Sequence, residues 1–385
     1  MALNKSPETR WAWVEIDQGA LRHNTRTLRS LLEPGVQMMC AVKADAYGHG
    51  AVACARVMAQ AGANQFAVAT VAEGAELREA GITQPILILS EPPVESIPYL
   101  LASRLMPSIM TEEFALAFGE AAAASGVPGR YHLAIDTGMN RFGVPYADAL
   151  ELRRAIDFHR GLSCEGCFTH FATADKLDDW DLALQAKHFM EALTSLHEAG
   201  FDCGLVHCDN TPGTILHPDL HLDMCRVGIG LYGLHAAPTT AERLELEPVM
   251  SVRARVTRVT SPAVGEGVSY GMTYRVPTKG TQIATIPLGY ADGYSRVLSN
   301  RAEVLVDGRR YAQVGAICMD QCMFAIEPAD ARAAAAPALV AGDVVTVMGV
   351  DGDDAITADE LAELIGTINY EITCHFGMRL EKLYV

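Results

Sequence analysis

The sequence lacks several features that mark whole classes of protein. No apolar run approaches the roughly 20 residues of a membrane-spanning helix, and the polar start from Asn4 to Arg10 does not resemble a secretory signal peptide. Basic residues are few, 30 against 47 acidic ones, so the formal net charge is −17. That charge argues against nucleic acid and anionic membrane surfaces as partners. We therefore expect a cytoplasmic protein that binds neither.

The ten cysteines do not indicate a disulfide framework or a metal centre. Many of them lie within apolar runs, as buried free thiols do. Cys164 and Cys167 have the spacing of a metal-binding pair, but no second pair stands at a matching distance. We interpret both as strand thiols, with a zinc site as the alternative, and predict no metal.

Residues 11–247 alternate between buried-strand and helical patterns. A chain of 385 residues has room for two domains, because one core rarely grows past about 250–300 residues. About eight strand–helix units can be counted, which predicts an α/β fold of the (β/α)8 TIM-barrel type. An open, doubly wound sheet stays possible, because strand order cannot be read from a sequence. The expected strands are 36–42, 65–70, 85–89, 105–110, 131–136, 163–170, 203–208 and 222–227.

The pattern changes after residue 247. Short runs rich in β-branched residues, separated by turn signals such as Asp307-Gly308, predict a C-terminal antiparallel β domain. We assign residues 248–385, together with 1–10, to this domain. The expected strands are 249–260, 283–288, 302–306, 314–317, 323–326 and 344–348, followed by a short helix at 359–365.

Lys43 closes the apolar run 36–42 and opens a segment of small residues, Tyr and His. Burial disfavours the ammonium form, so an amine at the end of a buried strand can become a nucleophile or a base near neutral pH. A Schiff-base lysine needs this property. The alternative is a lysine that starts a solvated loop, and the local pattern leaves the two interpretations about even.

Four further segments are each weak as signals. Arg141 lies in a glycine-containing stretch after a strand, and Arg226 precedes two glycines that would suit a phosphate. His170 would end the sixth strand, and Tyr270 lies among glycines of the β domain. Taken singly, a surface arginine, a glycine-rich connector, a core histidine and a loop aromatic are the better interpretations. Their joint occurrence is more informative.

Taken together, these segments resemble the alanine racemase family, which comprises pyridoxal phosphate enzymes of fold type III. The matching stretches follow the family's order along nearly the whole chain: 13–17, 21–24, 41–50, 136–141, 169–172, 226–228, 269–271, 289–293, 317–321 and 369–371. The segment around Lys43 and the Ile-Cys-Met-Asp-Gln segment at 317–321 are the most specific. The resemblance implies a barrel followed by a β domain, in agreement with the pattern of elements.

The resemblance also implies an activity. It is the interconversion of L-alanine and D-alanine with pyridoxal 5'-phosphate as cofactor, supplying D-alanine for cell-wall peptidoglycan. Racemisation needs a base on each face of Cα; Lys43 would serve one face and Tyr270, from the partner subunit of a homodimer, the other. The alternative is a serine or broad-spectrum amino-acid racemase on the same fold. Arg226 disfavours a decarboxylase, and the full β domain disfavours a non-catalytic cofactor carrier.

Further roles come with the resemblance. Arg226 would face the ring nitrogen of the cofactor and keep it unprotonated, and His207 would orient Arg226. The implied cofactor-binding residues are Lys43, Tyr47, His170, Thr211, Arg226, Gly228, Ile229 and Tyr370. The implied residues for the substrate carboxylate are Arg141 and Met319, with His207, Tyr290 and Asp320 in support.

Three positions depart from the family's pattern. Ala134 stands where the family often has a carbamylated lysine that fixes the arginine, and Asn140 replaces a glycine just before Arg141. Arg141 must therefore find other support, such as the Asn140 amide or a bound anion. Ala316 replaces an arginine of the substrate corridor, which predicts a less charged or wider passage.

Overall fold

The computed structural model describes residues 10–328, 339–377 and 379–385, and the chain forms two compact units. The first, here the barrel unit, comprises Ala20–Ala46 and Gly50–Glu247. The second, here the β unit, comprises Tyr47–His49 and the described residues within 10–19 and 248–385. Residues 1–9, which the sequence assigned to the β domain, lie outside the described part.

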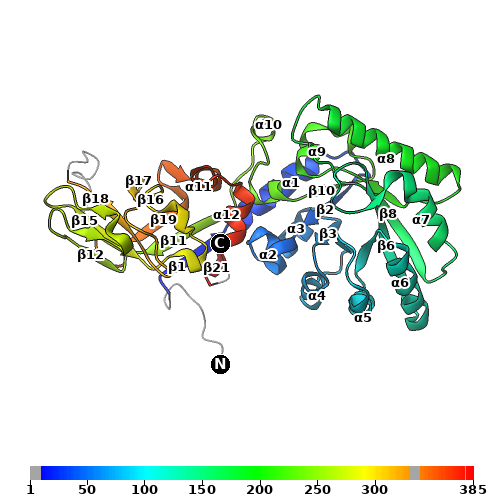
Figure 1. The fold of residues 1–385 in the computed structure, drawn as a ribbon, viewed down its shortest axis with the longest axis horizontal. Coiled ribbons are helices and arrows are strands. Elements are labelled where there is room, and N and C mark those ends of the chain that lie inside the picture. Colours follow the sequence, from blue (N-terminus) through cyan, green and yellow to red (C-terminus); the bar gives the residue numbers. More distant parts are fainter. Residues whose placement is uncertain (1–9, 329–338, 378) are drawn as a thin grey trace. The chain divides into compact units, whose positions relative to one another are not determined.

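Eight parallel strands form a nearly closed ring in the barrel unit (Figure 1). Each strand pairs with the next, and β10 pairs with β2. Asp223 N donates to Val206 O and Arg226 N to Asp209 O, both at 3.0 Å, which links the β9 and β10 segments. This closure confirms the predicted barrel over the doubly wound sheet. The strands are β2 Gln37–Ala41, β3 Gln65–Val68, β4 Ile86–Ile88, β5 Met106–Ile109, β6 Gly129–Asp136, β8 Leu162–Phe168, β9 Leu205–His207 and β10 Met224–Val227, with the short β7 Val144–Pro145 paired to β6.

Helices surround the ring (Figure 1). Several begin where the sequence supplies a capping side chain: Thr70 accepts from Glu73 N, Thr111 from Phe114 N, and Asp179 from Leu182 N. The helices are α1 Gln18–Ser30, α3 Ala51–Ala61, α4 Val71–Glu79, α5 Ile97–Ala102, α6 Glu112–Ser125, α7 Ala149–Ile156, α8 Trp180–Glu198, α9 Thr211–Leu216 and α10 Pro238–Ala241. No helix among the described residues is long and apolar enough to cross a membrane.

The β unit is built mainly from antiparallel strands, and only β1 and β21 among its described strands pair in parallel. Its largest sheet has the order β17-β16-β19-β11-β1-β21, and β20 pairs with β19. A second sheet has the order β12-β15-β18, and β13 and β14 form a ribbon. The strands are β1 Ala12–Ile16, β11 Met250–Arg255, β12 Arg258–Thr260, β13 Gly267–Val268, β14 Tyr274–Arg275, β15 Gln282–Ile286, β16 Glu303–Val306, β17 Arg309–Ala312, β18 Cys322–Ile326, β19 Val344–Asp351, β20 Asp354–Ile356 and β21 Glu381–Tyr384.

Three details of this unit differ from the prediction. Residues 11–19 were assigned to the barrel, but β1 pairs with β11 and β21 and so belongs to the β unit. The run 249–260 is two strands in two sheets rather than one. Residues 314–317 form no strand, because the backbone turns at Gly315, whose φ is 73°.

Two helices complete the β unit. The predicted helix at 359–365 is α11, Ala358–Ile365, and α12, Asn369–His375, was not predicted.

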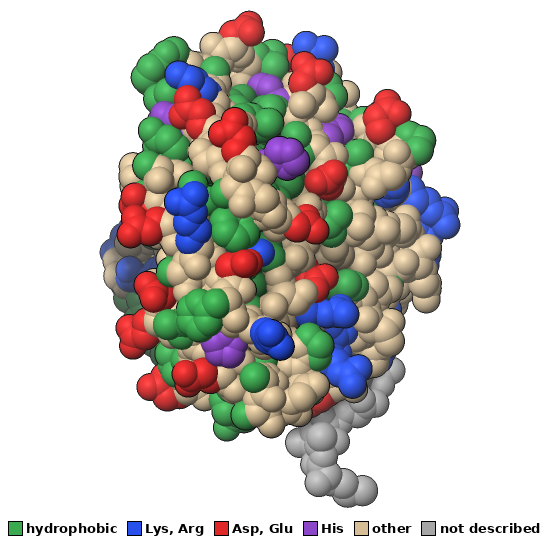
Figure 2. Space-filling model, turned by 90° about the vertical axis from the view of Figure 1, so that its right-hand side faces the viewer, with side chains coloured by type: hydrophobic (Ala, Val, Ile, Leu, Met, Phe, Trp, Pro, Cys, Tyr) green, Lys and Arg blue, Asp and Glu red, His purple; other side chains and the backbone are tan. Residues whose placement is uncertain are grey.

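The acidic composition is visible on the face drawn in Figure 2, where acidic side chains are scattered among basic and apolar ones. The negative charge is therefore not gathered into one patch on that face.

Candidate active site

Lys43 lies two residues past the end of β2 and begins an unusual turn. The four residues after it have φ values of 52° to 55°, in the left-handed region that non-glycine residues rarely enter even singly. Side chains hold this turn: Ala44 N donates to Glu73 Oε1, and the Asp45 carboxylate accepts from Ala51 N, both at 2.7 Å. Backbone strain that its surroundings maintain is concentrated at functional sites. The turn therefore sets Lys43 apart from a lysine in a plain loop.

Arg226 from β10 is the buried centre of a hydrogen-bond network. Its Nη1 lies 2.7 Å from His207 Nδ1, and its Nη2 lies 3.3 Å from His170 Nδ1. Nη2 also donates to the carbonyl oxygens of Thr169 (2.7 Å) and Cys208 (2.9 Å). Burial lowers the pKa of Arg226 to about 10, so the guanidinium stays charged at neutral pH. The structure thus brings together Arg226, His207 and His170, as the resemblance implied.

The histidines of this network are neutral. Burial, and then the charge of Arg226, keep the pKa of His170 and of His207 well below the usual value. Arg141 and Lys43 lower the pKa of His170 further. Because a guanidinium only donates, both Nδ1 atoms accept and both Nε2 atoms carry the proton. His170 therefore keeps one N–H to donate elsewhere.

His132 belongs to the same network and was not predicted. Its Nδ1 lies 2.8 Å from His207 Nε2, and burial lowers the pKa of His132 to about 3. Gly166, its register partner on β8, makes room for the ring, since a Cβ there would lie 2.5 Å from His132 Nδ1. A lone histidine in an apolar strand carries no motif. Gly166 lies opposite His132 only through the pairing of β6 with β8, so no local sequence signal could have identified this residue.

Arg141 lies beside this network. Together with His170, Thr169 and Phe142 it lines a small cavity of about 10 Å³, and its guanidinium lies 5.0 Å from the centre of the Phe142 ring. Among the described residues no hydrogen bond joins the Asn140 amide to Arg141, and Asn140 Nδ2 donates to Gly138 O at 3.1 Å. Asn140 has a φ of 53°, which explains why a glycine also suits this position.

Thr211, Gly228 and Ile229 come together at the ends of β9 and β10. Gly228 N donates to Thr211 Oγ1 at 2.8 Å, and Gly228 precedes the 3-10 helix η4, Ile229–Tyr232. A Cβ at Gly230 would lie 2.7 Å from Thr211 Cγ2, so the close backbone approach requires glycine. The first N–H groups of a helix lack partners within it and suit an anion.

Tyr270 in the β unit lies on a strained turn. Ser269, Gly271 and Met272 all have positive φ, and Ser269 Oγ donates to the carbonyl oxygen of the buried Ala316 at 2.6 Å. The Tyr270 side chain is 75% exposed and borders a cavity of about 530 Å³. The turn thus presents the phenol at the surface of this unit.

The remaining predicted residues of the β unit lie in two groups. Tyr290 N donates to Cys318 O and Ala291 N to Met319 O, both at 3.0 Å, which joins the two motif segments. Asp320 accepts from Arg379 Nη2 at 2.7 Å. Tyr47 and Tyr370 form a ring pair with centroids 6.0 Å apart. Burial, followed by Tyr370, raises the pKa of Tyr47.

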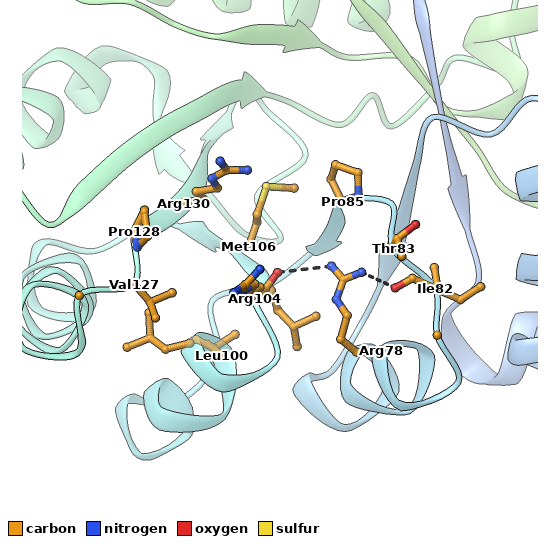
Figure 3. A pocket seen from close by; sticks show the side chains of 14 residues that line it. Arg78, Ile82, Thr83, Pro85, Leu100, Arg104, Met106, Val127, Pro128 and Arg130 are labelled. Atoms are coloured by element: carbon orange, nitrogen blue, oxygen red, sulfur yellow. Dashed lines mark hydrogen bonds between the residues drawn. The ribbon is translucent and has the colours of Figure 1, made fainter.

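A cavity of about 690 Å³ lies elsewhere in the barrel unit (Figure 3). Its lining includes Pro85, Met106 and Arg130, which stand at the starts of β4, β5 and β6. Arg78 at its rim donates to the carbonyl oxygens of Ile82 (2.6 Å) and Ser103 (3.0 Å) and so fastens two loops. Chemistry in barrels of this type is placed at the opposite strand ends, where Lys43 lies.

Two family models match the chain over nearly its full length. They are "Alanine racemase, N-terminal domain" at residues 16–236 and "Alanine racemase, C-terminal domain" at residues 249–384. An alanine racemase of Synechocystis sp. is 42% identical over 378 residues, covering 97% of this chain and 99% of the relative. One of Desulfovibrio desulfuricans is 40% identical over 373 residues, covering 97% and 98%.

Solved structures agree with these relatives. Alanine racemase of Clostridium difficile 630 superposes with a TM-score of 0.91 at 34% identity, covering 97% of this chain and 96% of that one. The enzyme of Bacillus anthracis with bound L-Ala-P has a TM-score of 0.90 at 34% identity, covering 98% and 95%. The matches span both units and the segments that carry Lys43 and Tyr270, and the chain therefore belongs to the alanine racemase family.

Proposed function

We propose that this racemase interconverts L-alanine and D-alanine with pyridoxal 5'-phosphate, using Lys43 and Tyr270 as bases on opposite faces of Cα. The observation that carries the proposal is the network of Arg226 with two neutral histidines close to Lys43. An arginine that is buried, charged and held by neutral partners is a fixed donor rather than half of an ion pair. Such a group suits an acceptor on a ligand, here the ring nitrogen of the cofactor.

Several of the predicted residues fit this cofactor. Lys43 supplies the amine for covalent attachment, and Thr211, Gly228 and Ile229 supply a hydroxyl and backbone N–H groups for the phosphate. Gly230 lets the Thr211 side chain pack closely against the backbone, since a Cβ there would lie 2.7 Å from Thr211 Cγ2. The phenols of Tyr47 and Tyr370 are proposed as further phosphate ligands. When bound, pyridoxal phosphate withdraws electrons from the amino carbon of the substrate and acidifies its Cα proton.

The chain's own groups then move the proton. Lys43 Nζ takes the Cα proton from one face or returns it there, and the Tyr270 hydroxyl does the same on the other face. A free phenol titrates near ~10, so Tyr270 needs a donor that stabilises its oxygen after proton loss. The His170 Nε2–H is proposed for this task, since Arg226 occupies Nδ1. Arg141 and the Met319 N–H would hold the substrate carboxylate.

We also propose a homodimer whose sites combine residues of two subunits. In the β unit, Tyr270, Met319 and Tyr290 lie in the motif segments, yet they are 75%, 53% and 41% exposed. Large exposed side chains at functional positions are typical of a surface that a partner covers. A twofold pair of subunits would cover both copies equally. The proposed location is the cytoplasm, where D-alanine would enter peptidoglycan synthesis.

The experiment that tests this function follows the optical rotation of L-alanine with the purified, cofactor-loaded protein. Rotation should decay to zero, and L-serine should react far more slowly. A broad-spectrum racemase is the second candidate, because the small Ala316 stands where an arginine would narrow the corridor. Equal rates on L-alanine and L-serine would favour that candidate. A stable rotation with both substrates would contradict the proposed function.

A further inference from the structure

A second group of chemically capable side chains lies in the barrel unit, next to the site described above. Asp209 follows β9, His221 precedes β10, and Cys225 lies on β10. All three are buried, and one ligand-type atom of each lies within 4.8 Å of those of the other two. We propose that Asp209, His221 and Cys225 bind one divalent metal ion of the zinc type.

Asp209 is the strongest observation. Both of its carboxylate oxygens are buried, and neither has a hydrogen-bond partner in the described part of the chain. A buried carboxylate without partners is costly, so such groups are normally paired or bind a cation. Asp209 does not cap α9, because Asn210 accepts from Gly213 N. A Cβ at Gly213 would lie 2.4 Å from Asp209 Oδ1, so the helix packs closely against this carboxylate.

His221 is oriented as metal-binding histidines are. Its Nε2 lies 3.0 Å from the carbonyl oxygen of Thr214, which can only accept. Nε2 therefore carries the proton, and Nδ1 keeps a lone pair. A metal-ligating histidine usually donates its other ring N–H to a carbonyl or carboxylate in this way. The bond to Thr214, in α9, also fixes the plane of the ring.

Cys225 is the third proposed ligand, and its side chain lies on the face of β10 opposite to that of Arg226. Successive side chains of a strand point to opposite faces, so Cys225 and its neighbour Arg226 face opposite ways. The Cys225 thiol hydrogen-bonds with the Thr214 side chain, and its sulfur lies 3.8 Å from the carbonyl oxygen of His221. Cys225 thus makes no hydrogen bond within the Arg226 network and lies close to the His221 ring that would share the ion.

The donor set favours zinc over calcium or magnesium. One oxygen, one nitrogen and one sulfur suit a borderline ion, whereas Ca²⁺ and Mg²⁺ prefer oxygen alone. A carboxylate and a thiolate together would balance the two positive charges. In a tetrahedral site the ligand atoms lie roughly 3.3–3.6 Å apart, given the usual metal–ligand bond lengths. Shifts of about 1 Å would bring these three side chains to that separation, with water as a fourth ligand.

No sequence pattern indicates this site, and the sequence analysis predicts no metal. Spacings of 12 and 4 residues match no short motif, and the three residues meet only through the closure of the barrel at β9 and β10. The rival location is the Cys164–Cys167 pair, to which the fold adds Cys203: the Cys167 thiol hydrogen-bonds with those of Cys164 and Cys203. An experiment must separate the two locations.

The test measures metal content on the reduced, cofactor-loaded protein after chelation, incubation with zinc and desalting. We expect about one zinc per chain, lost in Cys225→Ser and in Asp209→Asn but retained in Cys167→Ser. Cobalt in place of zinc should give a sulfur-to-metal charge-transfer band with the same pattern. A wild-type protein without bound zinc, or zinc lost in Cys167→Ser and kept in Cys225→Ser, would overturn the proposal.

Thermal unfolding of the wild type gives a second readout that does not depend on the variants folding. Zinc should raise the Tm of the wild type by several degrees, because the ion binds the folded chain only. The Tm of Asp209→Ala should be the same with and without zinc. If Asp209 is only a poorly placed acid, zinc will leave the wild-type Tm unchanged and Asp209→Ala will raise it.

Discussion

The two units present their functional side chains in opposite ways. In the barrel unit, Arg226 and His207 are buried, His170 is partly buried, and the three are hydrogen-bonded to one another, so their protonation states and orientations are set within one subunit. In the β unit, Tyr270 and Met319 are exposed on strained or tightly bonded loops. A buried network provides fixed electrostatics, whereas an exposed phenol needs a partner surface before its surroundings can tune it. In the proposed homodimer, the barrel unit would supply a preorganised half of the site and the β unit a half that is completed by the partner subunit.

The largest effect is expected from the barrel side. Lys43→Ala should lower the racemisation rate by about 10⁴-fold or more, because it removes both covalent attachment and one base. Borohydride reduction of the wild type should fix the cofactor on the peptide that contains Lys43. Mass mapping checks the position. Attachment to another lysine would contradict the assignment.

Tyr270→Phe should lose about 10²- to 10⁴-fold in rate, since one of two proton-transfer groups is removed. Cofactor binding and its attachment to Lys43 should persist, because the phenol belongs to the exposed half. Deuterium wash-in from heavy water should become biased toward one enantiomer. A wild-type rate, or wash-in without bias, would exclude Tyr270 as a base.

Mixing the two inactive variants sharpens the same comparison. If each site combines the barrel unit of one subunit with the β unit of the other, a heterodimer of Lys43→Ala and Tyr270→Phe holds one intact site. Random exchange should then restore about one quarter of the wild-type activity. Exchange without any recovery would place Tyr270 in the site of its own chain.

The buried histidines predict how stability depends on pH. His132 has a pKa of about 3 in the folded state and about 6.5 when unfolded. Between these values the unfolded chain binds the extra proton, so stability falls as the pH is lowered from 6.5 toward 3. The contribution is about 1.4 kcal/mol per pH unit. Urea unfolding at several pH values should show this slope, and His132→Gln should reduce it by that amount. Equal slopes would contradict a neutral His132.

Much of this organisation could be predicted from local sequence. Barrel strands that are buried on both faces have continuous apolar sequences, and α11 begins and ends within a residue of the predicted positions. Capping residues such as Thr111 set helix starts. The separate segments around Lys43 and Arg226 could be recognised, but whether they meet depends on the closure of the ring.

The predictions that failed concern features that depend on long-range contacts. The place of β1 follows from its pairing with β11, far along the chain, and no local pattern encodes that choice. His132 acquires its role only because Gly166 lies opposite it on the neighbouring strand. The alternating run 249–260 obeys the rule for one strand, yet its two halves join different sheets. The local sequence pattern identifies a strand, whereas long-range pairing decides which strands lie beside it.

The smallest effect is expected at Asn140. If Phe142 rather than Asn140 supports Arg141, Asn140→Gly removes only the side-chain bond to Gly138 and keeps a residue suited to positive φ. Unfolding free energy should then change by less than about 1 kcal/mol, and the KM for L-alanine should stay within about twofold. Phe142→Ala is the matched comparison, and it should raise KM several-fold, because Arg141 loses the ring beneath its guanidinium. A large rise in KM for Asn140→Gly together with an unchanged Phe142→Ala would reverse the assignment. It would also show that this loop, unlike the Arg226 network, needs an amide to hold its arginine.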